Sequence, residues 1–516
     1  MIKQEFRVFL VLLVLVSVTS GCSGQNRNTT SQQATGSLQT AAEVEGKSYI
    51  VSSDFNGFNA QMLRGPSWKT PGFVERVKEL YPGIIRYPGG TVASYWDWKS
   101  GWLMEGIELR SEWKSITQKN PITIEDLKYA CDQTGASPVF VVNMMTSTLS
   151  YQLEMLRYAQ KTGLPVKYVE LDNELYLGEA FYVKKYTTGV EYANDANIWI
   201  AAIKKEFPGV RIAAVGSSVK EGAAKKEKKH AERTNNWNRD VISILKGCDA
   251  LTFHIYGGSG LNYIVNQNSA PDDDETPSGK NEALQKAFDK SGSVPFILGS
   301  PFLRWNNANM YDYKILPQGM KAWVTEYNLF EREGIMAGTW VHGLYALSQT
   351  LLFMENPATE LICFHNLTTS AQFAAIFNND QGFAKAYKKK PNKPFDFTAA
   401  GYCLSMSGKA MSEGGKAVKL KFSDNVMQSA ARGQKYPSLN GWVIQSGKGK
   451  KIIVTNLSDT ETTVDFSKTI TGNVQYEQLN SDPLKQIASE NDVVKSKGTG
   501  TKIKLPAYSV TLIEGE

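Results

Sequence analysis

The chain has 516 residues, 42% of them hydrophobic and 21% charged, and a formal net charge of +6. This is ordinary globular composition, and the length exceeds that of one ordinary domain. The densest positive run, residues 225–229, accompanies no nucleic-acid-binding motif, so we expect a solvated face there and no nucleic-acid partner.

The N-terminal segment has the features of an export signal. A positively charged start precedes an unbroken apolar run at residues 9–16, which is too short to span a membrane well. Small residues then lead to Cys22, as in the bacterial lipobox, whose cysteine becomes the lipidated N-terminus. Ser23 follows, which by resemblance to enterobacterial sorting argues against retention in the inner membrane. We predict a signal peptide over 1–21 and a lipid anchor at Cys22 in the outer membrane; a plain secretory signal is the alternative.

The segment after the cysteine is rich in Ser, Gly, Gln, Asn, Thr and Ala to about residue 42. Such a composition has little apolar surface to bury, so we predict a flexible tether over residues 22–45. The other cysteines show no metal-ligand spacing, and we expect four buried free thiols. They are Cys131, Cys248, Cys363 and Cys403.

Short apolar runs alternate with amphipathic stretches from about residue 48 to 412, the pattern of repeated βα units. Eight strands are expected, at 54–59, 84–87, 139–144, 166–171, 212–216, 250–255, 322–327 and 360–365. Helical patterns lie at 73–80, 124–134, 151–162, 195–206 and 336–354. This predicts a (β/α)8 TIM barrel over residues 46–415. The rival, an open doubly wound sheet, lacks a Gly-rich fingerprint after its first strand.

The connection between the sixth and seventh expected strands, residues 257–320, is unusually long. It holds an acidic stretch at 272–275, a helical pattern near 281–290 and several aromatic side chains, among them Trp305. Long loops are more often functional than idle, and we expect this one to lie over the active-site face of the barrel.

The pattern changes near residue 415 to short strands separated by turn residues. The expected strands are 417–422, 442–446, 451–456, 461–466, 473–479 and 501–514. This predicts an all-β sandwich over residues 416–516, to which a strand at 47–51 is added.

Two of the expected barrel strands end in a glutamate. Residues 166–174 read Val-Lys-Tyr-Val-Glu-Leu-Asp-Asn-Glu, and residues 321–328 read Lys-Ala-Trp-Val-Thr-Glu-Tyr-Asn. Glu174 and Glu326 thus follow strands four and seven, and charged groups at the carboxyl ends of barrel strands are typical of catalytic residues. For either one alone, a surface carboxylate is the ordinary alternative. Together they predict a retaining glycosidase, in which one carboxyl group protonates the leaving oxygen and the other attacks the anomeric carbon; this requires carboxyl groups about 5–5.5 Å apart.

These residues carry a resemblance to the clan A glycoside hydrolases. Within the clan the chain most resembles the family 51 α-L-arabinofuranosidases and the family 79 glucuronidase and heparanase relatives. Residues 85–90, Ile-Arg-Tyr-Pro-Gly-Gly, with Tyr-Trp-Asp-Trp at 95–98, are similar to the strand-two signature of these families. Residues 170–174 are similar to their Glu-x-Gly-Asn-Glu, with Asp172 in place of Gly, and residues 505–512 resemble the last strand of their sandwich.

The resemblance implies that Glu174 is the acid/base and Glu326 the nucleophile, and it implies roles for further residues. Arg86 would hold Glu326 ionised, unless it forms a purely structural ion pair. Asn173 would bind the sugar 2-hydroxyl. An Asp at position 172 would either bulge the strand or bring a third carboxylate near the site.

The resemblance also makes four more residues candidates for contact with substrate or nucleophile. His254 and Tyr256 share one face of strand six, so Tyr256 could donate to Glu326 and His254 could bind substrate. The alternative for His254 is a histidine satisfied within the barrel. Asn143 ends strand three and could touch the sugar. Trp96 could stack on a sugar face, although packing within its loop would explain it equally well.

The sequence therefore predicts an exported retaining glycoside hydrolase acting on a polysaccharide or oligosaccharide, arabinofuranosidase-like, with no metal and no cofactor because paired carboxylates suffice. A β-glucuronidase, xylosidase or agarase-like hydrolase would show the same two glutamates. An alternative of another class is a non-catalytic glycan-binding surface lipoprotein. The sugar, its linkage, exo or endo action and the oligomeric state stay open.

Overall fold

A computed structural model describes residues 38–516 except 61–62, 64, 115, 117–119, 219–230, 259–292, 331–335, 337, 369–373, 379–390 and 431–432. The predicted signal peptide, Cys22, the charged run at 225–229 and the helical pattern at 281–290 lie outside the described residues. In the described part of the chain, no helix is both long enough and apolar enough to cross a membrane.

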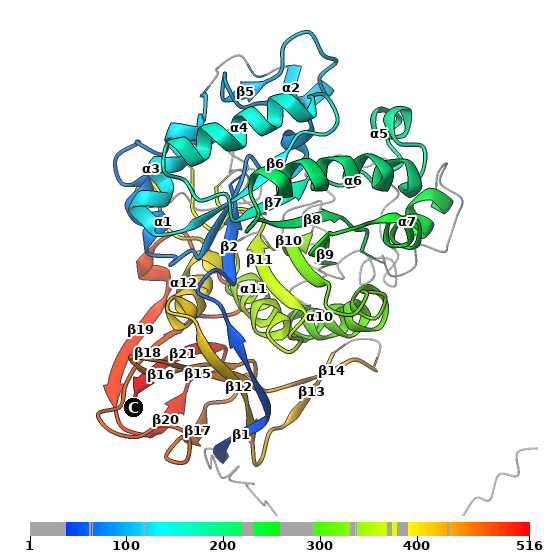
Figure 1. The fold of residues 1–516 in the computed structure, drawn as a ribbon. Helices are drawn as coiled ribbons and strands as arrows, with labels where there is room; N and C mark the ends of the chain where they lie inside the picture. The colour runs from blue at the N-terminus through cyan, green and yellow to red at the C-terminus, as the bar shows by residue number, and fades with distance from the viewer. Residues whose placement is uncertain are drawn as a thin grey trace, which may run out of the picture. The chain divides into compact units, whose positions relative to one another are not determined.

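Eight parallel strands close into a barrel, which confirms the predicted fold class (Figure 1). In order around the barrel they are β10 (Lys321–Phe330), β11 (Thr359–Phe364), β2 (Asn56–Asn59), β3 (Ile84–Tyr87), β6 (Ser137–Val142), β7 (Tyr168–Leu171), β8 (Arg211–Val215) and β9 (Ala250–Gly258). Seven of the eight strands, all but β2, each contribute one or two side chains to an apolar cluster that fills the barrel interior. Two of its members are Tyr168 and Trp323, whose rings meet edge to face. This packed layer is a floor beneath the carboxyl ends of the strands.

Helices follow the strands around the barrel. They are α1 (Phe73–Lys78), α3 (Ile124–Thr134), α4 (Leu149–Lys161), α6 (Gly189–Glu206), α7 (Ala231–Ile244), α10 (Ser293–Asn307), α11 (Trp340–Phe353) and α12 (Ala399–Met411), with short α2 (Ser111–Lys114) and α5 (Ala180–Lys185) in loops. The local sequence sets some ends: α3 begins with a capping box between Thr123 and Asp126 and ends at Gly135, whose φ of 79° suits only glycine well. Every residue of α11 is buried, since α10, α12, the barrel and the sandwich surround it.

The long connection between β9 and β10 supplies a barrel helix that its sequence did not predict. α10 occupies residues 293–307 and continues as a short π-helical segment, Ala308–Tyr313. Pro301 lies inside α10, and such a residue argues against a helix when only the sequence is read. The described part of this connection is therefore the sixth helix of the barrel, not a lid over its mouth.

The C-terminal region is a nine-stranded sheet of order β19-β18-β21-β16-β15-β12-β1-β17-β20. Its strands are β1 (Leu38–Val51), β12 (Gly415–Phe422), β15 (Leu439–Ser446), β16 (Gly449–Asn456), β17 (Thr462–Asp465), β18 (Gln475–Asn480), β19 (Val494–Thr499), β20 (Lys502–Leu505) and β21 (Ser509–Gly515). Val464 and Ile503 from one end of the sheet share a core with Val443 and Ile452 from its middle, so the sheet folds into two layers. Small hairpins are β4 (Trp96–Asp97) with β5 (Trp102–Leu103), and β13 (Met427–Ser429) with β14 (Lys435–Pro437).

The predicted tether must be corrected at its C-terminal end. β1 begins at Leu38 and pairs with β12 on one side and β17 on the other. Thr40 and Ala42 are buried within this sheet, although the composition of the segment gave no sign of it. Residues 38–45 therefore belong to the sandwich, because strand pairing and two small buried side chains replace the large apolar residues that a strand usually shows.

The sandwich is fixed to the barrel through the start of α11. The backbone N–H groups of Trp340 and Val341 donate to the carbonyls of Lys485 and Pro483, and the Trp340 indole donates to the Tyr508 carbonyl at 2.6 Å. The four cysteines in the described chain are free thiols; three are buried and Cys248 is partly exposed.

Candidate active site

A β-bulge in β10 aims Glu326 into the barrel mouth. Trp323 aligns with Thr252 of β9, but Glu326 aligns with His254, so three residues of β10 span two of β9. Side chains of a regular strand alternate between faces, so Trp323 and Glu326, three apart, would point in opposite directions. The extra residue puts Trp323 in the barrel interior and Glu326 above it, as bulges beside active sites do.

Four side chains hold the Glu326 carboxylate, which is only 6% exposed. Oε1 accepts hydrogen bonds from Arg86 Nη1 at 2.9 Å and from Asn59 Nδ2 at 3.1 Å. Oε2 accepts one from the Tyr256 hydroxyl at 2.7 Å and lies 3.5 Å from His254 Nδ1. Burial opposes ionisation, but the charges of His254 and Arg86 and the Tyr256 hydroxyl lower the pKa of Glu326 to about 2. Glu326 is therefore an anion at neutral pH, as a nucleophile must be.

Glu174 lies on a corner just beyond β7. Backbone φ angles of 74° at Asp172 and 49° at Glu174 turn the chain there. Glu174 Oε1 accepts a hydrogen bond from the Tyr176 hydroxyl at 3.1 Å and lies 2.9 Å from His254 Nδ1. Its side chain is 21% exposed, more than that of Glu326, so an incoming molecule can reach it.

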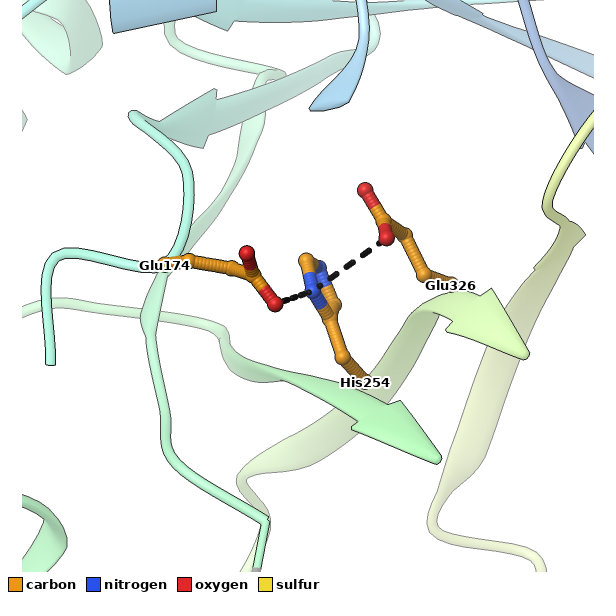
Figure 2. A group of neighbouring side chains, drawn as sticks. All are labelled: Glu174, His254 and Glu326. Carbon is orange, nitrogen blue, oxygen red and sulfur yellow. Dashed lines mark hydrogen bonds and ion pairs between the residues drawn. The ribbon is translucent and has the colours of Figure 1, made fainter. Parts of the chain in front are cut away.

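Glu174, His254 and Glu326 converge on one point above the barrel interior. One carboxylate oxygen of each glutamate and a ring nitrogen of His254 all lie within 4.8 Å of one another. Figure 2 shows the His254 ring between the two carboxylates, which approach it from opposite sides. Three such ligand atoms could in principle meet a cation, but the Glu326 oxygens already accept three hydrogen bonds, one from the Arg86 cation. This donor set fits a buried anion better than a metal ligand.

The hydrogen atoms around His254 can be placed by donor and acceptor logic. The Thr325 hydroxyl donates to Glu170 Oε1 at 3.1 Å, so its oxygen is left to accept from His254 Nε2 at 3.2 Å. Nε2 therefore carries a hydrogen. One further proton lies between His254 Nδ1 and Glu174 Oε1, on one atom or the other. Burial opposes the charged ring, but Glu326 and Glu174 together raise the pKa of His254.

Arg86 links the two halves of the site from beneath. It is fully buried, donates through Nε and Nη2 to both oxygens of Glu170 at 2.6 and 2.9 Å, and donates through Nη2 to Asn173 Oδ1 at 2.7 Å. This fixes the Asn173 amide with its oxygen toward Arg86. Asn173 Nδ2 is buried and has no partner among the described residues, so a donor is left over for a ligand.

Asp172 is buried and bonded to protein atoms, not presented to a substrate. One oxygen accepts from Ser94 Oγ and the Asn173 N–H, at 2.5 and 2.7 Å. The other accepts from the N–H groups of Met144 and Met145, at 2.7 and 2.9 Å. Burial raises the pKa of Asp172 to about 6 against these four hydrogen bonds. It adopts the positive φ that a glycine would take in the resembling motif, and its side chain fastens three loops together.

Two residues expected to contact substrate have other partners. Asn143 is 1% exposed; its Nδ2 donates to the Trp96 carbonyl and Thr146 Oγ1, and its Oδ1 accepts from the Thr146 N–H. Trp96 is 4% exposed and donates through its indole to the Tyr87 hydroxyl at 2.9 Å. These side chains organise the loops after β3 and β6, where internal polar bonds and packing already use them, and contact of either with a sugar stays a prediction.

The structure also places four further residues at the site that were not among the predicted site residues. Asn59 contacts Glu326 directly, and His365 lies 3.6 Å from it. Glu170 and Thr325 complete the network below. Asn59 closes the first barrel strand, so the rule that polar residues at strand ends form the site would have found it. Glu170 and Thr325 lie inside strands and gave no such signal.

No model of a protein family matches the chain. An intracellular exo-α-(1→5)-L-arabinofuranosidase of Acetivibrio thermocellus is 29% identical over 167 residues, 29% of this chain and 32% of that protein. α-L-Arabinofuranosidase C of Emericella nidulans is 28% identical over 188 residues, 32% and 33% of the two chains. The chain thus matches only about a third of the length of these curated relatives.

Solved structures share the fold over nearly the whole chain. A thermostable family 51 α-L-arabinofuranosidase from Thermotoga petrophila has a TM-score of 0.62 at 17% identity and covers 92% of this chain and 100% of its own. A 4-O-α-L-rhamnosyl-β-D-glucuronidase from Fusarium oxysporum has a TM-score of 0.56 at 11% identity, with coverages of 92% and 100%. The chain's homologues and fold neighbours are thus those that its motifs predicted.

Proposed function

We propose that this protein is a retaining glycoside hydrolase with Glu174 as acid/base and Glu326 as nucleophile. One observation carries the proposal: oxygens of the two carboxylates lie within 4.8 Å of each other at the carboxyl ends of β7 and β10. Retaining enzymes hold their carboxyl groups about 5–5.5 Å apart, whereas inverting enzymes need about 6.5–9.5 Å to admit a water. The short separation leaves room for an anomeric carbon but not for a water on its far side.

In the first step, a Glu326 oxygen attacks the anomeric carbon as the bond to the leaving oxygen breaks. The proton held between Glu174 and His254 goes to that oxygen through Glu174, so the leaving group departs as a neutral alcohol. The product is a glycosyl ester on Glu326. Arg86 and Tyr256 hold the attacking carboxylate in position by two hydrogen bonds.

In the second step, Glu174 acts as a base. It takes a proton from a water that attacks the anomeric carbon, the ester bond to Glu326 breaks, and Glu326 is again an anion. The spare Asn173 Nδ2 would donate to a sugar hydroxyl next to the reacting carbon, a contact that strengthens as positive charge develops there.

The substrate proposed is an α-L-arabinofuranoside. The support is the likeness to curated arabinofuranosidases and to solved family 51 structures. A panel of aryl glycosides tests it: α-L-arabinofuranoside, β-xyloside, β-glucuronide and β-galactoside, followed by polysaccharides. Preference for another sugar would overturn the arabinofuranosidase proposal and leave the mechanism standing.

Two variants test the mechanism itself. Glu326→Ala should lose turnover on every aryl glycoside, and azide should then restore it with inverted product, because azide enters from the face that Glu326 leaves empty. The matched control is Glu154→Gln, which removes an exposed carboxylate paired with Lys99. If wild type and Glu326→Ala bind glycans equally and neither turns them over, the chain is a glycan-binding protein.

We also propose export and lipidation at Cys22. The support is the sequence of residues 1–23 alone, and the Acetivibrio thermocellus relative is named as intracellular. Labelled palmitate should enter the wild-type chain expressed in a Gram-negative host and not the Cys22→Ser variant. Equal labelling of both would contradict the anchor.

A further inference from the structure

Asn59, at the end of β2, joins the proposed nucleophile to His365, which directly follows the neighbouring strand β11. Its Nδ2 lies 3.1 Å from Glu326 Oε1 and 2.7 Å from His365 Nδ1. All three residues are less than a tenth exposed, so water does not compete for these contacts. Two partners on one amide nitrogen use both of its hydrogens.

The orientation of the Asn59 amide follows from its neighbours. Turned the other way, its oxygen would face the ionised Glu326 carboxylate at 3.1 Å, and two acceptors would repel each other. In the orientation found, Oδ1 lies against the backbone of Gly89, where a β-carbon would come within 1.8 Å of it. Oδ1 accepts no hydrogen bond among the described residues. The negative charge of Glu326 therefore fixes the Asn59 amide with its donor, Nδ2, facing both Glu326 and His365.

We propose that Asn59 is a positioning residue that holds His365 as a neutral ring, with its hydrogen on Nε2 and its bare Nδ1 beside the nucleophile. The amide can donate to Nδ1 only if that nitrogen carries no hydrogen. A protonated ring would place two donors 2.7 Å apart and break the bond. The role in catalysis rests on the proposed function; the ring state does not.

The neutral ring matters because His365 Nδ1 lies 3.6 Å from Glu326 Oε2. An imidazolium there would form an ion pair with the carboxylate and compete with the Tyr256 hydroxyl for the same oxygen. Asn59 thus keeps one Glu326 oxygen from being bound too tightly to attack.

The charges around the ring favour the neutral state. The other ring nitrogen, Nε2, lies 3.4 Å from Asn366 Nδ2, so a hydrogen on Nε2 requires that the Asn366 amide turn its oxygen toward the ring. Burial lowers the pKa of His365, as do the charges of Arg86 and His254, against the opposing effect of Glu326. The titratable groups around the ring are Glu326 on β10, Arg86 on β3, His254 and Tyr256 on β9, and Glu174 beyond β7. The Asn59 hydrogen bond adds a geometric constraint to this electrostatic one.

Nitrogen-15 NMR on the full chain labelled at histidine tests the ring state directly. The chain has four histidines, so the spectrum is simple, and a His365→Gln variant assigns the signal. Long-range correlations should show Nδ1 bare and Nε2 protonated from about pH 5 to about pH 8, across the range in which an ordinary histidine titrates. A hydrogen on Nδ1, or an imidazolium, in the wild-type protein would overturn the proposal.

Two substitutions at position 59 should move the ring state in a defined way. Asn59→Ala should raise the titration midpoint of His365 by about one pH unit, the shift that corresponds to losing one hydrogen bond to the neutral ring. Asn59→Asp should bring a hydrogen onto Nδ1, because a carboxylate accepts where the amide donated. The matched control is Asn56→Ala on the same strand, a buried amide whose polar atoms have no partners among the described residues.

Kinetics then separate this inference from the proposed function. Asn59→Ala should lower kcat by about tenfold with little change in KM, since the interaction acts on the reacting carboxylate. If wild-type His365 has the expected ring state but no glycoside is hydrolysed, the proposed function fails and the ring assignment stands. If hydrolysis occurs and Asn59→Ala behaves like Asn56→Ala, the positioning role is overturned.

Discussion

The ends of β7 and β10 supply the same functional group in two different settings. Glu326 lies within the ladder of β10, is aimed by a bulge, and accepts three hydrogen bonds, one of them from a buried cation. Glu174 lies beyond the last residue of β7, on a corner with positive φ, and is more exposed. Among the described residues its hydrogen-bond partners are Tyr176 and His254. The setting within β10 favours one rigid, ionised carboxylate at Glu326. The setting at the corner leaves the Glu174 carboxyl group accessible for proton exchange.

In the proposed mechanism, this difference in setting gives the two glutamates of one barrel two different roles. The nucleophile must be ionised and immobile, so its neighbours are donors and positive charges. The acid/base must lose and regain a proton in each cycle, so it shares one with His254 and stands where substrate and water can reach it. The following changes test whether the two ends differ as described.

The largest effect should separate the two glutamates by leaving group. Glu326→Gln should lower kcat by about 10⁴-fold or more on all aryl glycosides, because no nucleophile remains. Glu174→Gln should lower kcat/KM severely with a poor phenolate leaving group but only mildly with dinitrophenolate, which departs without a proton, because kcat/KM reports the first step and not the base-assisted second step. Steady-state kinetics on a series of leaving groups measures this. If the two variants lost the same activity with every leaving group, the assignment of different roles to Glu174 and Glu326 would be contradicted.

A second prediction concerns the donor beside the acid/base. Asn173→Ala should lower kcat/KM by about 10- to 100-fold, the value of one strong hydrogen bond in the transition state. A 2-deoxy substrate offers no hydroxyl to Asn173 Nδ2, so on it the variant and the wild type should differ little. If the variant loses as much activity on the 2-deoxy substrate, Asn173 acts only through Arg86.

A third, smaller effect compares the tyrosines at the two ends. Tyr256→Phe should cost about tenfold in kcat whatever the leaving group, because it removes a donor to the nucleophile. Tyr176→Phe should matter mainly for poor leaving groups, because it contacts Glu174. The two variants are matched in size and each removes one hydroxyl. Interchanged patterns would reverse the assignment of acid and nucleophile.

These differences were only partly predictable from the sequence. The eight strands were predicted because each is a run of apolar, β-forming residues between turns, and the two glutamates because each closes such a run. The bulge in β10 was not predicted, because one added residue leaves the apolar pattern unchanged. Likewise, asparagine and tryptophan are residue types common in sugar-binding sites, so the sequence suggested Asn143 and Trp96. Only the structure shows that their polar groups are hydrogen-bonded within the protein.

Other parts of the fold depended on long-range pairing. Residues 38–45 look like a tether, yet they form a strand because β12 and β17, more than 370 residues later in the chain, lie on either side. Helix α10 contains a proline and was not predicted, but burial against α11 stabilises it. The sequence of a segment alone does not show which distant strand or helix will pack against it.

The smallest effect concerns the buried carboxylate at the β7 corner. Folding raises the pKa of Asp172 from its ordinary value near 3.8 to about 6, so its contribution to the free energy of unfolding is present below about pH 4 and is lost as the pH rises through 6. Asp172→Asn should remove this dependence. The free energy of unfolding of the variant relative to wild type should rise by at most about 3 kcal/mol between pH 4 and pH 7.

Denaturant titrations of both proteins at several pH values measure that difference. The other carboxylates are common to both proteins and cancel in the comparison. A difference that stays constant across this pH range would show that Asp172 is ionised in the folded protein throughout.

The central claim is that Glu326 bonds to the sugar while Glu174 moves the proton. The most direct measurement uses a 2-deoxy-2-fluoro derivative of the best aryl substrate, which slows the second step so that the glycosyl-enzyme accumulates. Mass spectrometry of the digested protein should find one added sugar on the peptide that contains Glu326, and none in the Glu326→Gln variant. A label on any other residue, or a product of inverted configuration from the wild-type protein, would contradict the mechanism.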